Sequence, residues 1–351
     1  MSEPLTTGTH GTIETIELAP GYVIPRLLRG GWQLAGGHGE VDRARALADI
    51  TRFVDAGLNT VDGADIYSGV EALYGEFNAL RRACGLSRLQ VHTKCVPDYD
   101  DLAQVDAAYL RRIVERSLQR LNVERLDLVQ LHWWDYGVPG GVGAALALVE
   151  LKREGKVAHI GGTNFDTSQT KAMLDAGVPL VSMQVQYSLL DRRPENALVA
   201  LGVPLLCYGT LAGGFFSERW LGAAEPGGEL SNRSLIKYKL VIDDFGGWAA
   251  FQELLRALQA IARRHGVSIA TVATRWVLDR PGVAGAIVGA RYADHLSETL
   301  AVFRLKLDAQ DHAVLAPLLT AHDGPAGDTY ALERDKTGRH GRIMKYNLNK
   351  S

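Results

Sequence analysis

The sequence has only three cysteines, no long apolar run and no excess of charge of one sign. Cys84, Cys95 and Cys207 are too few and too widely spaced for a disulfide framework or a Cys-x-x-Cys metal site. No run of about 18 apolar residues predicts a transmembrane helix. The polar N-terminus, M-S-E-P-L-T-T-G-T-H, is not a signal peptide. We therefore expect a cytoplasmic protein that holds no metal.

Several common signatures of function are also missing. The formal net charge is -2 over 351 residues, which gives no electrostatic reason to expect nucleic acid or a membrane surface as a partner. The motifs G-x-G-x-x-G, G-x-x-x-x-G-K-[ST], H-E-x-x-H and G-x-S-x-G do not occur. Their absence removes the usual sequence arguments for a Rossmann dinucleotide site, a P-loop, a zinc protease and an α/β hydrolase.

Short apolar runs alternate with segments of helical periodicity through most of the chain. The runs are rich in Val, Leu and Ile and lack clean alternation, as is typical of parallel strands that are buried on both faces. Strands are expected at 26–31, 59–62, 89–94, 125–132, 157–161, 180–184, 203–208 and 285–289. Helices are expected at 42–56, 69–82, 104–121, 142–154, 168–176, 194–201, 248–265, 268–278, 294–303 and 309–319. This alternation predicts an α/β fold, a single-domain (β/α)8 barrel.

The ends of the chain and one long connection depart from this rhythm. Residues 1–25 form a lead-in with a possible hairpin, because two apolar segments flank the turn signal A-P-G. Residues 26–322 form the barrel, and residues 323–351 form a polar, glycine-rich tail. The connection 209–247 is long for a compact domain, which favours a functional role for it.

One polar side chain follows nearly every predicted strand. They are Asp62, Lys94, His132, Asn164, Gln184 and Tyr208. A (β/α)8 barrel carries its chemistry at the carboxyl ends of its strands, so these side chains should meet at one mouth. Any one of them alone could be structural. As an ordered set they favour an active site.

Four of the residues near this mouth suit proton transfer to an oxygen. The phenol of Tyr67 has an ordinary pKa of about 10, which a neighbouring ammonium such as Lys94 would lower. Asp62 would keep Lys94 charged and in place. His132 could hydrogen-bond a substrate carbonyl oxygen or share the tyrosine proton. Such a group can protonate an oxygen that gains charge as a carbonyl is reduced.

At these positions the sequence resembles the aldo-keto reductase superfamily. The matching motifs are D-x-A-x-x-Y at 62–67, T-K at 93–94, L-H at 131–132, G-x-x-N-F at 161–165, Q-x-x-Y-S-L-L at 184–190 and G-A-R-x-x-x-x-L-x-E at 289–298. They occur in order between about residues 26 and 305. The resemblance implies an oxidoreductase that interconverts a carbonyl and an alcohol by hydride transfer. It implies NADP(H), or sometimes NAD(H), bound to a barrel rather than to a Rossmann fold.

The resemblance also assigns roles to individual residues. Tyr67 is then the general acid/base, Asp62 and Lys94 tune its pKa, and His132 orients the carbonyl. Asn164 and Gln184 would hold the nicotinamide carboxamide, and Tyr208 would stack on the ring. Residues of the connection would cover the pyrophosphate, and residues after the last strand would surround the adenosine. The residues that would cover the pyrophosphate are Leu211, Gly213 and Arg233. The residues that would surround the adenosine are Gly289, Arg291, His295, Glu298 and Thr299.

The chain departs from the family pattern at four places. Gly63 follows Asp62 of the D-x-A-x-x-Y motif, and Gly209-Thr210 follows Tyr208. His295 and Thr299 replace the usual residues at the adenosine end. Arg291 still offers a fixed charge for a 2′-phosphate, whereas His295 is only partly charged near neutral pH. We therefore expect NADP(H) to be favoured, with NAD(H) as the alternative.

Other readings stay open at this point. Trp32, Trp133 and Trp134 could wall an apolar pocket for a small-molecule substrate or plug the barrel rim, and Arg233 could be an ordinary solvated arginine. The protein could instead be a cofactor-binding regulatory or accessory subunit with little turnover. A non-redox barrel enzyme such as an isomerase is a third possibility. The oligomeric state and the substrate are not encoded in any motif.

Overall fold

Eight parallel strands close into a barrel in the order β10-β11-β4-β5-β6-β7-β8-β9. The computed structural model describes residues 7–10, 13–35, 39–195, 197–228 and 230–349. The barrel strands are β4 (Leu27–Gly30), β5 (Thr60–Asp62), β6 (Gln90–Cys95), β7 (Leu126–Leu131), β8 (Val157–Thr163), β9 (Leu180–Gln186), β10 (Leu205–Tyr208) and β11 (Val283–Gly289). The (β/α)8 barrel that the sequence predicts is confirmed.

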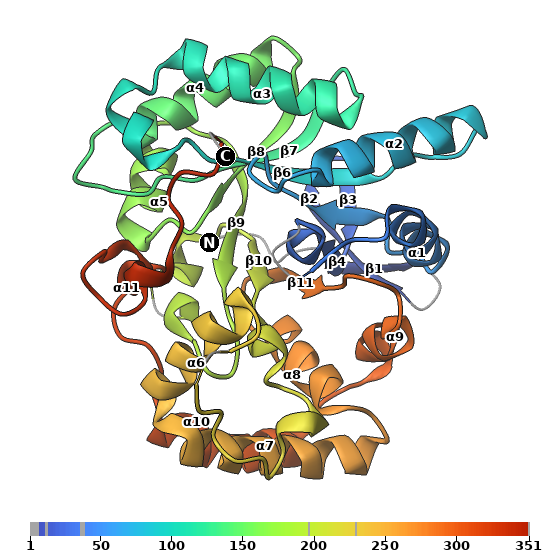
Figure 1. The fold of residues 1–351 in the computed structure, drawn as a ribbon, viewed down its shortest axis with the longest axis vertical. Helices are drawn as coiled ribbons and strands as arrows, with labels where there is room; N and C mark the ends of the chain where they lie inside the picture. Colours follow the sequence, from blue (N-terminus) through green and yellow to red (C-terminus); the bar gives the residue numbers. More distant parts are fainter. Residues whose placement is uncertain (1–6, 11–12, 36–38, 196, 229, 350–351) are drawn as a thin grey trace.

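Helices surround the barrel (Figure 1). They are α1 (Arg43–Asp55), α2 (Val70–Ala83), α3 (Ala107–Leu121), α4 (Gly141–Arg153), α5 (Thr167–Asp175), α6 (Arg233–Phe245), α7 (Gly247–His265), α8 (Ile269–Leu278), α9 (Leu296–Arg304), α10 (Ala309–Ala321) and α11 (Ala331–Arg334). Their ends follow local chemistry. The side chain of Asp42 accepts a hydrogen bond from the Arg45 N–H at 3.0 Å and so starts α1. Gly57, at a φ of 89°, follows the end of that helix.

A small antiparallel sheet closes the N-terminal end of the barrel. It contains β1 (Thr7–His10), β2 (Ile13–Ala19) and β3 (Tyr22–Pro25). Ile16 and Ile24 pack in one cluster with Leu28, Leu128 and Leu206 of the barrel strands. Full burial of each such side chain stabilises the fold by about 1.5–3 kcal/mol. This end of the barrel is therefore packed with apolar side chains.

The predicted hairpin is present as β2 and β3, which pair in antiparallel register. The lead-in is more regular than expected, because β1 pairs with β2. The rest of the predicted lead-in, residues 1–6 and 11–12, lies outside the described residues, as do residues 36–38 of the glycine-rich loop after β4 and residues 350–351 of the tail.

Two predictions of local structure were wrong. The helix expected at 194–201 consists of two single 3-10 turns, η3 (Arg193–Glu195) and η4 (Val199–Leu201). Pro194 has no N–H to donate, and Gly202, at a φ of 73°, ends the second turn. Conversely, the connection 209–247 contains the helix α6. Its first turn is capped by Asn232, whose side chain accepts a hydrogen bond from the Leu235 N–H at 3.0 Å.

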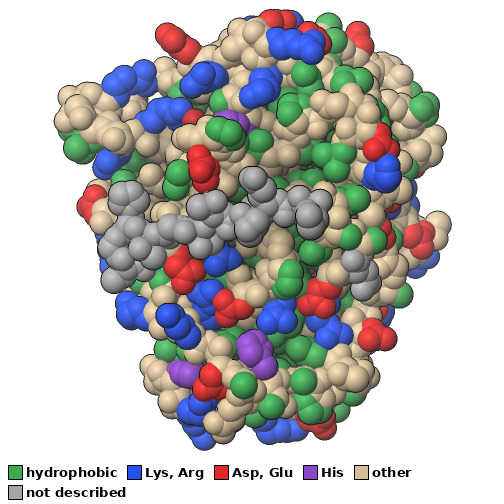
Figure 2. Space-filling view, turned by 180° about the vertical axis from the view of Figure 1, so that it is seen from behind, with side chains coloured by type: hydrophobic (Ala, Val, Ile, Leu, Met, Phe, Trp, Pro, Cys, Tyr) green, Lys and Arg blue, Asp and Glu red, His purple; other side chains and the backbone are tan. Residues whose placement is uncertain are grey.

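Within the described part of the chain, no helix combines the length and apolar character that a membrane span needs. Figure 2 shows the side opposite to that of Figure 1, where acidic and basic side chains are interspersed.

Candidate active site

A cavity of about 910 Å³ opens at the carboxyl ends of the barrel strands. Parallel register aligns these ends, since Gly30 of β4 pairs with Asp62 of β5, and Lys94 of β6 pairs with Gln130 of β7. Most of the predicted site residues line this cavity. They are Trp32, Asp62, Tyr67, Lys94, His132, Asn164, Gln184, Tyr208, Leu211, Gly213, Arg233 and Gly289.

Asp62 and Lys94 form a buried ion pair at the floor of the cavity. The Lys94 Nζ lies 2.7 Å from the Asp62 Oδ2 and also donates to the Gly63 carbonyl at 2.8 Å. Burial is the largest single effect and disfavours the ammonium, but the charges of Asp62 and Tyr67 and the hydrogen bonds to them together outweigh it, so the pKa of Lys94 is raised. Lys94 is therefore fully charged at neutral pH.

Tyr67 lies beside this ion pair. The Lys94 Nζ is 5.1 Å from the centroid of the Tyr67 ring, and the Trp32 ring is 5.1 Å from it on a tilted contact. Burial raises the pKa of the phenol, and the Lys94 charge offsets this only in part. Lys94 thus acts in the predicted direction, but the net shift of the Tyr67 pKa is upward because burial is the larger effect.

His132 offers one free ring nitrogen to the cavity region. Its Nδ1 lies 3.1 Å from the Thr163 carbonyl, which can only accept, so Nδ1 carries the proton. Burial and the charge of Arg334 lower the His132 pKa to about 3, so the ring is neutral. Its buried Nε2 has no hydrogen-bond partner among the described residues and can accept a hydrogen bond from a hydroxyl group. A buried acceptor without a partner is costly, which favours a bound group at this point.

A network of amides surrounds the ion pair. The Gln184 Nε2 donates to the Asp62 Oδ1 at 2.6 Å and to the Gln130 Oε1 at 3.1 Å. The Tyr208 hydroxyl donates to the Asn164 Oδ1 at 2.8 Å. Asn164 has a φ of 63°, a left-handed conformation that asparagine tolerates better than most residues. Gln130 was not predicted as a site residue, because it lies within a strand rather than after one.

The loop after β10 and the start of α6 form one end of the cavity. Gly213 has a φ of 65°, and a Cβ there would lie 2.7 Å from the Tyr238 ring and 3.0 Å from the Ser234 carbonyl. The glycine thus lets the loop pack closely against the first turn of α6. The Arg233 Nη2 donates to the Ile343 carbonyl at 2.9 Å. Leu211, Gly213 and Arg233 are brought together as predicted.

The residues predicted for the adenosine end lie beyond the cavity, except for Gly289. The His295 side chain is 81% exposed, and its Nδ1 lies 3.1 Å from the Glu298 Oε1. The Thr299 hydroxyl donates to the His295 carbonyl at 3.1 Å. The buried side chain of Arg29 donates to the Arg291 carbonyl at 3.1 Å and holds that backbone after β11.

The tryptophans after β7 have different environments. Trp133 is 1% exposed and does not line the cavity; its indole N–H donates to the Val138 carbonyl at 2.9 Å. Trp134 lines the cavity instead, with its ring 4.2 Å from the His132 ring in an edge contact. The sequence W-W gives no signal that separates the two.

The C-terminal tail supplies cavity residues that the sequence reasoning did not assign. They are Tyr330, Arg342, Ile343, Met344, Lys345 and Leu348. No regular periodicity marks them, so the sequence carried no signal for them. Among the described residues there is no group of three or more His, Cys, Asp or Glu side chains that could hold a metal ion.

Comparisons with known proteins identify the family of this chain. The model of the aldo/keto reductase family matches residues 26–319. The chain therefore belongs to the aldo/keto reductase family and is an oxidoreductase of the carbonyl and alcohol class. It is 25% identical to a glycerol dehydrogenase from Gluconobacter oxydans of known structure. That match has a TM-score of 0.73 and covers 90% of this chain and 97% of the other.

Curated relatives extend this picture. The chain is 26% identical over 325 residues to the NADH-specific methylglyoxal reductase of Escherichia coli (strain K12), covering 85% of this chain and 95% of that protein. It is 30% identical over 258 residues to flagellar radial spoke protein 5 of Chlamydomonas reinhardtii, covering 62% of this chain. The match spans only 49% of that longer protein.

Proposed function

We propose that the protein is an NAD(P)H-dependent enzyme that interconverts an aldehyde, ketone or sugar carbonyl with the alcohol, using Tyr67 as general acid/base. One observation carries this proposal. A buried Asp62–Lys94 ion pair, Tyr67 and the partnerless Nε2 of His132 belong to one site. Proton transfer to an oxygen needs a positioned donor and a nearby charge that stabilises its anion, and the three groups supply both.

The residues fit a nicotinamide cofactor. Asn164 and Gln184 present amide groups, and Tyr208 presents an aromatic ring. All three line the same cavity as Asp62, Tyr67, Lys94 and His132. When bound, the cofactor supplies or accepts the hydride at the carbon. In reduction the Tyr67 hydroxyl gives its proton to the carbonyl oxygen, and Lys94 stabilises the phenolate that is left. The neutral His132 accepts a hydrogen bond from the Tyr67 or product hydroxyl through Nε2.

The choice of cofactor is the finer part of the proposal. Arg291 favours NADP(H), because a guanidinium matches the geometry of a 2′-phosphate. NAD(H) is the alternative, since His295 is exposed beside Glu298 and one relative is named as NADH-specific. For the substrate, we propose a small carbonyl or alcohol compound held against Trp32 and Trp134.

Titration with NADPH and NADH, followed by tryptophan fluorescence, tests the cofactor. Turnover of a panel of carbonyls and alcohols then tests the reaction. We expect Tyr67→Phe to lower kcat by roughly 10²–10⁴-fold with little change in cofactor affinity. Tyr109→Phe, on α3 away from the cavity, is the control. Binding of neither cofactor would overturn the redox proposal, and binding without turnover would favour the accessory-subunit alternative.

A further inference from the structure

The C-terminal tail crosses the mouth of the cavity. It leaves α10, forms α11 and η7 (Gly341–Ile343), and reaches the loop after β6, as the red part of the ribbon in Figure 1 shows. Along this path it contributes Tyr330, Arg342 and Met344, among others, to the cavity wall. A ligand in the cavity would therefore lie beneath the tail.

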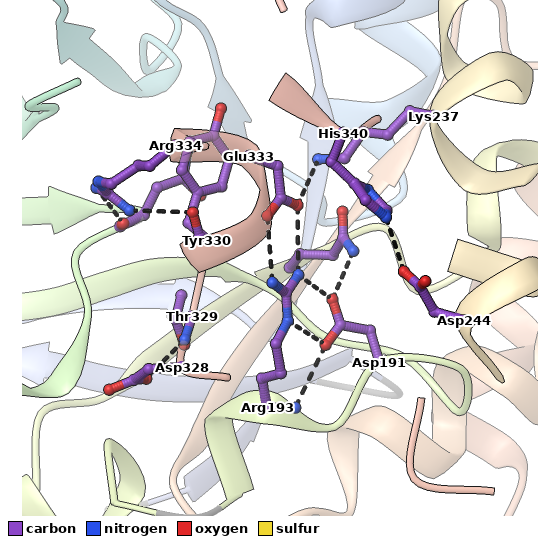
Figure 3. Close-up of polar contacts among 12 residues, drawn as sticks. Asp191, Arg193, Lys237, Asp244, Asp328, Thr329, Tyr330, Glu333, Arg334 and His340 are labelled. Carbon is purple, nitrogen blue, oxygen red and sulfur yellow. Dashed lines mark hydrogen bonds and ion pairs between the residues drawn. The ribbon is translucent and has the colours of Figure 1, made fainter. Parts of the chain in front are cut away.

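The near end of the tail is fixed by buried charges (Figure 3). Glu333 of α11 is 1% exposed and accepts hydrogen bonds from the two terminal nitrogens of Arg193 at 3.2 and 3.3 Å. Arg193 also donates to Asp191, at 2.9 Å from Nε and 2.7 Å from Nη2. The Lys237 Nζ lies 3.8 Å from Glu333. Breaking a buried pair of this kind leaves an uncompensated buried charge, so we expect this end to stay in place when the far end opens.

The far end of the tail is held by hydrogen bonds and aromatic contacts. The Asp98 Oδ1 accepts hydrogen bonds from the backbone N–H groups of Leu348 at 2.8 Å and of Asn349 at 2.9 Å. The Tyr99 N–H donates to the Tyr346 carbonyl at 2.9 Å, and the Tyr346 ring lies 5.2 Å from the Trp134 ring. These are part-buried hydrogen bonds, with Asp98 only 1% exposed, and they include no ion pair, so we expect this end to open more readily than the Glu333 end.

Positively charged side chains outnumber negatively charged ones in the lining of the cavity. Asp62 neutralises Lys94, and Glu333 accompanies Lys237. The other charged side chains of the lining are Arg233, Arg342 and Lys345, all cationic, and none forms an ion pair with a described residue. Arg342 acts on Asp335 only through a longer-range charge effect. Arg233 donates to the carbonyl of Ile343 and so contacts the tail at the residue that follows Arg342 in the sequence.

We propose that residues 323–349 form a clamp over the cofactor, in which Arg342 of the tail joins Arg233 in holding the pyrophosphate. The contacts on Asp98 then form a latch that opens to let the cofactor leave. This inference rests on the proposed function. A pyrophosphate carries two adjacent negative charges, which match two guanidinium groups that line one cavity and form no ion pair with a described carboxylate. A phosphate or carboxylate of the substrate shares this chemistry, and the experiment separates the two sources.

The first arm measures cofactor affinity in the full-length chain. Arg342→Gln should raise the Kd of both NADPH and NADH by roughly ten- to a hundred-fold, as expected for a lost charge-assisted hydrogen bond. Arg342→Lys should recover part of the affinity. Arg342→Gln should leave the Kd of reduced nicotinamide riboside unchanged, because that compound has no phosphate. Lys171→Gln, an exposed cation on α5, is the control and should bind like wild type.

The second arm measures the latch. Asp98→Ala should speed NADPH dissociation in a stopped-flow chase by about tenfold or more. Trypsin should cut the tail at Arg342 or Lys345 more slowly in wild type with NADPH, and rapidly in Asp98→Ala with or without it. Circular dichroism melting checks that both variants fold. The proteolysis readout does not depend on turnover.

The outcomes separate the clamp from the proposed function. If wild type binds neither cofactor, the proposed function fails and the clamp fails with it. If wild type binds but Arg342→Gln and Asp98→Ala bind and release the cofactor unchanged, only the clamp is overturned. If Arg342→Gln raises the KM of glyceraldehyde 3-phosphate relative to glyceraldehyde while the cofactor Kd is unchanged, Arg342 serves a substrate anion and the clamp is overturned.

Discussion

Tyr67 is a weak acid that its surroundings make weaker. Burial raises the pKa of the phenol, and Lys94 offsets only part of that rise. A donor with a raised pKa stays protonated across the physiological range, which suits carbonyl reduction. Alcohol oxidation needs the phenolate instead, so its rate should rise with pH towards the Tyr67 pKa. The direction of the pKa shift therefore favours reduction near neutral pH.

Replacing Lys94 by Met should separate the effect of the Lys94 charge on the Tyr67 pKa from the effect of burial. Because the ammonium lowers the Tyr67 pKa, its loss should raise that pKa further. The rising limb of alcohol oxidation should then move to higher pH, and kcat/KM should fall by roughly 100-fold or more. Pre-steady-state and steady-state rates between pH 6 and 10 give the profile. Lys171→Met is the control. An unchanged pH profile would mean that Lys94 does not tune Tyr67.

At the scale of elements, two segments that carry no strand decide the shape of the site. The loop after β10 meets the first turn of α6, which brings Gly213 and Arg233 to one end of the cavity. Residues of the tail line the same end of the cavity. The sequence placed Arg233 at this end through the family resemblance, but α6 itself was missed. Its apolar residues Leu235, Tyr238 and Ile242 have helical spacing and are buried.

Gly213→Ala tests the packing of this loop. The new Cβ would lie 2.7 Å from the Tyr238 ring in a backbone conformation that favours glycine, so the loop must shift. We expect destabilisation of roughly 1–3 kcal/mol and a weaker affinity for NADPH. Gly222→Ala is the matched control, because Gly222 also has a positive φ of 72° but has open space around it. Thermal unfolding and fluorescence titration give both quantities. Equal effects in the two variants would show that backbone strain alone matters.

For the whole molecule, the chemistry and the N-terminal sheet lie at opposite ends of the barrel. The cavity opens at the carboxyl ends of the strands, whereas β2 and β3 pack against Leu28, Leu128 and Leu206 at the other end. The barrel core between them separates stability at one end from catalysis at the other.

Ile24→Ala should therefore cost stability without changing catalysis. Ile24 is fully buried, and removing its outer carbons should lower the free energy of unfolding by about 2–5 kcal/mol. Its neighbour Val23 is 43% exposed, so Val23→Ala should change stability by no more than about 0.5 kcal/mol. Urea unfolding measures both. The kcat per folded molecule should equal that of wild type, and a large loss of kcat would contradict this separation.

The sequence by itself determined the barrel and its mouth. Buried parallel strands need unbroken apolar runs, and the register of a closed barrel requires polar residues after those runs to meet, as Asp62, Lys94, His132 and Gln184 do. Only the tertiary structure decided the rest. The tautomer of His132 depends on the Thr163 carbonyl, and Trp134 rather than Trp133 faces the cavity. The tail follows contacts with residues far away in the chain, which leave no periodic pattern in the sequence.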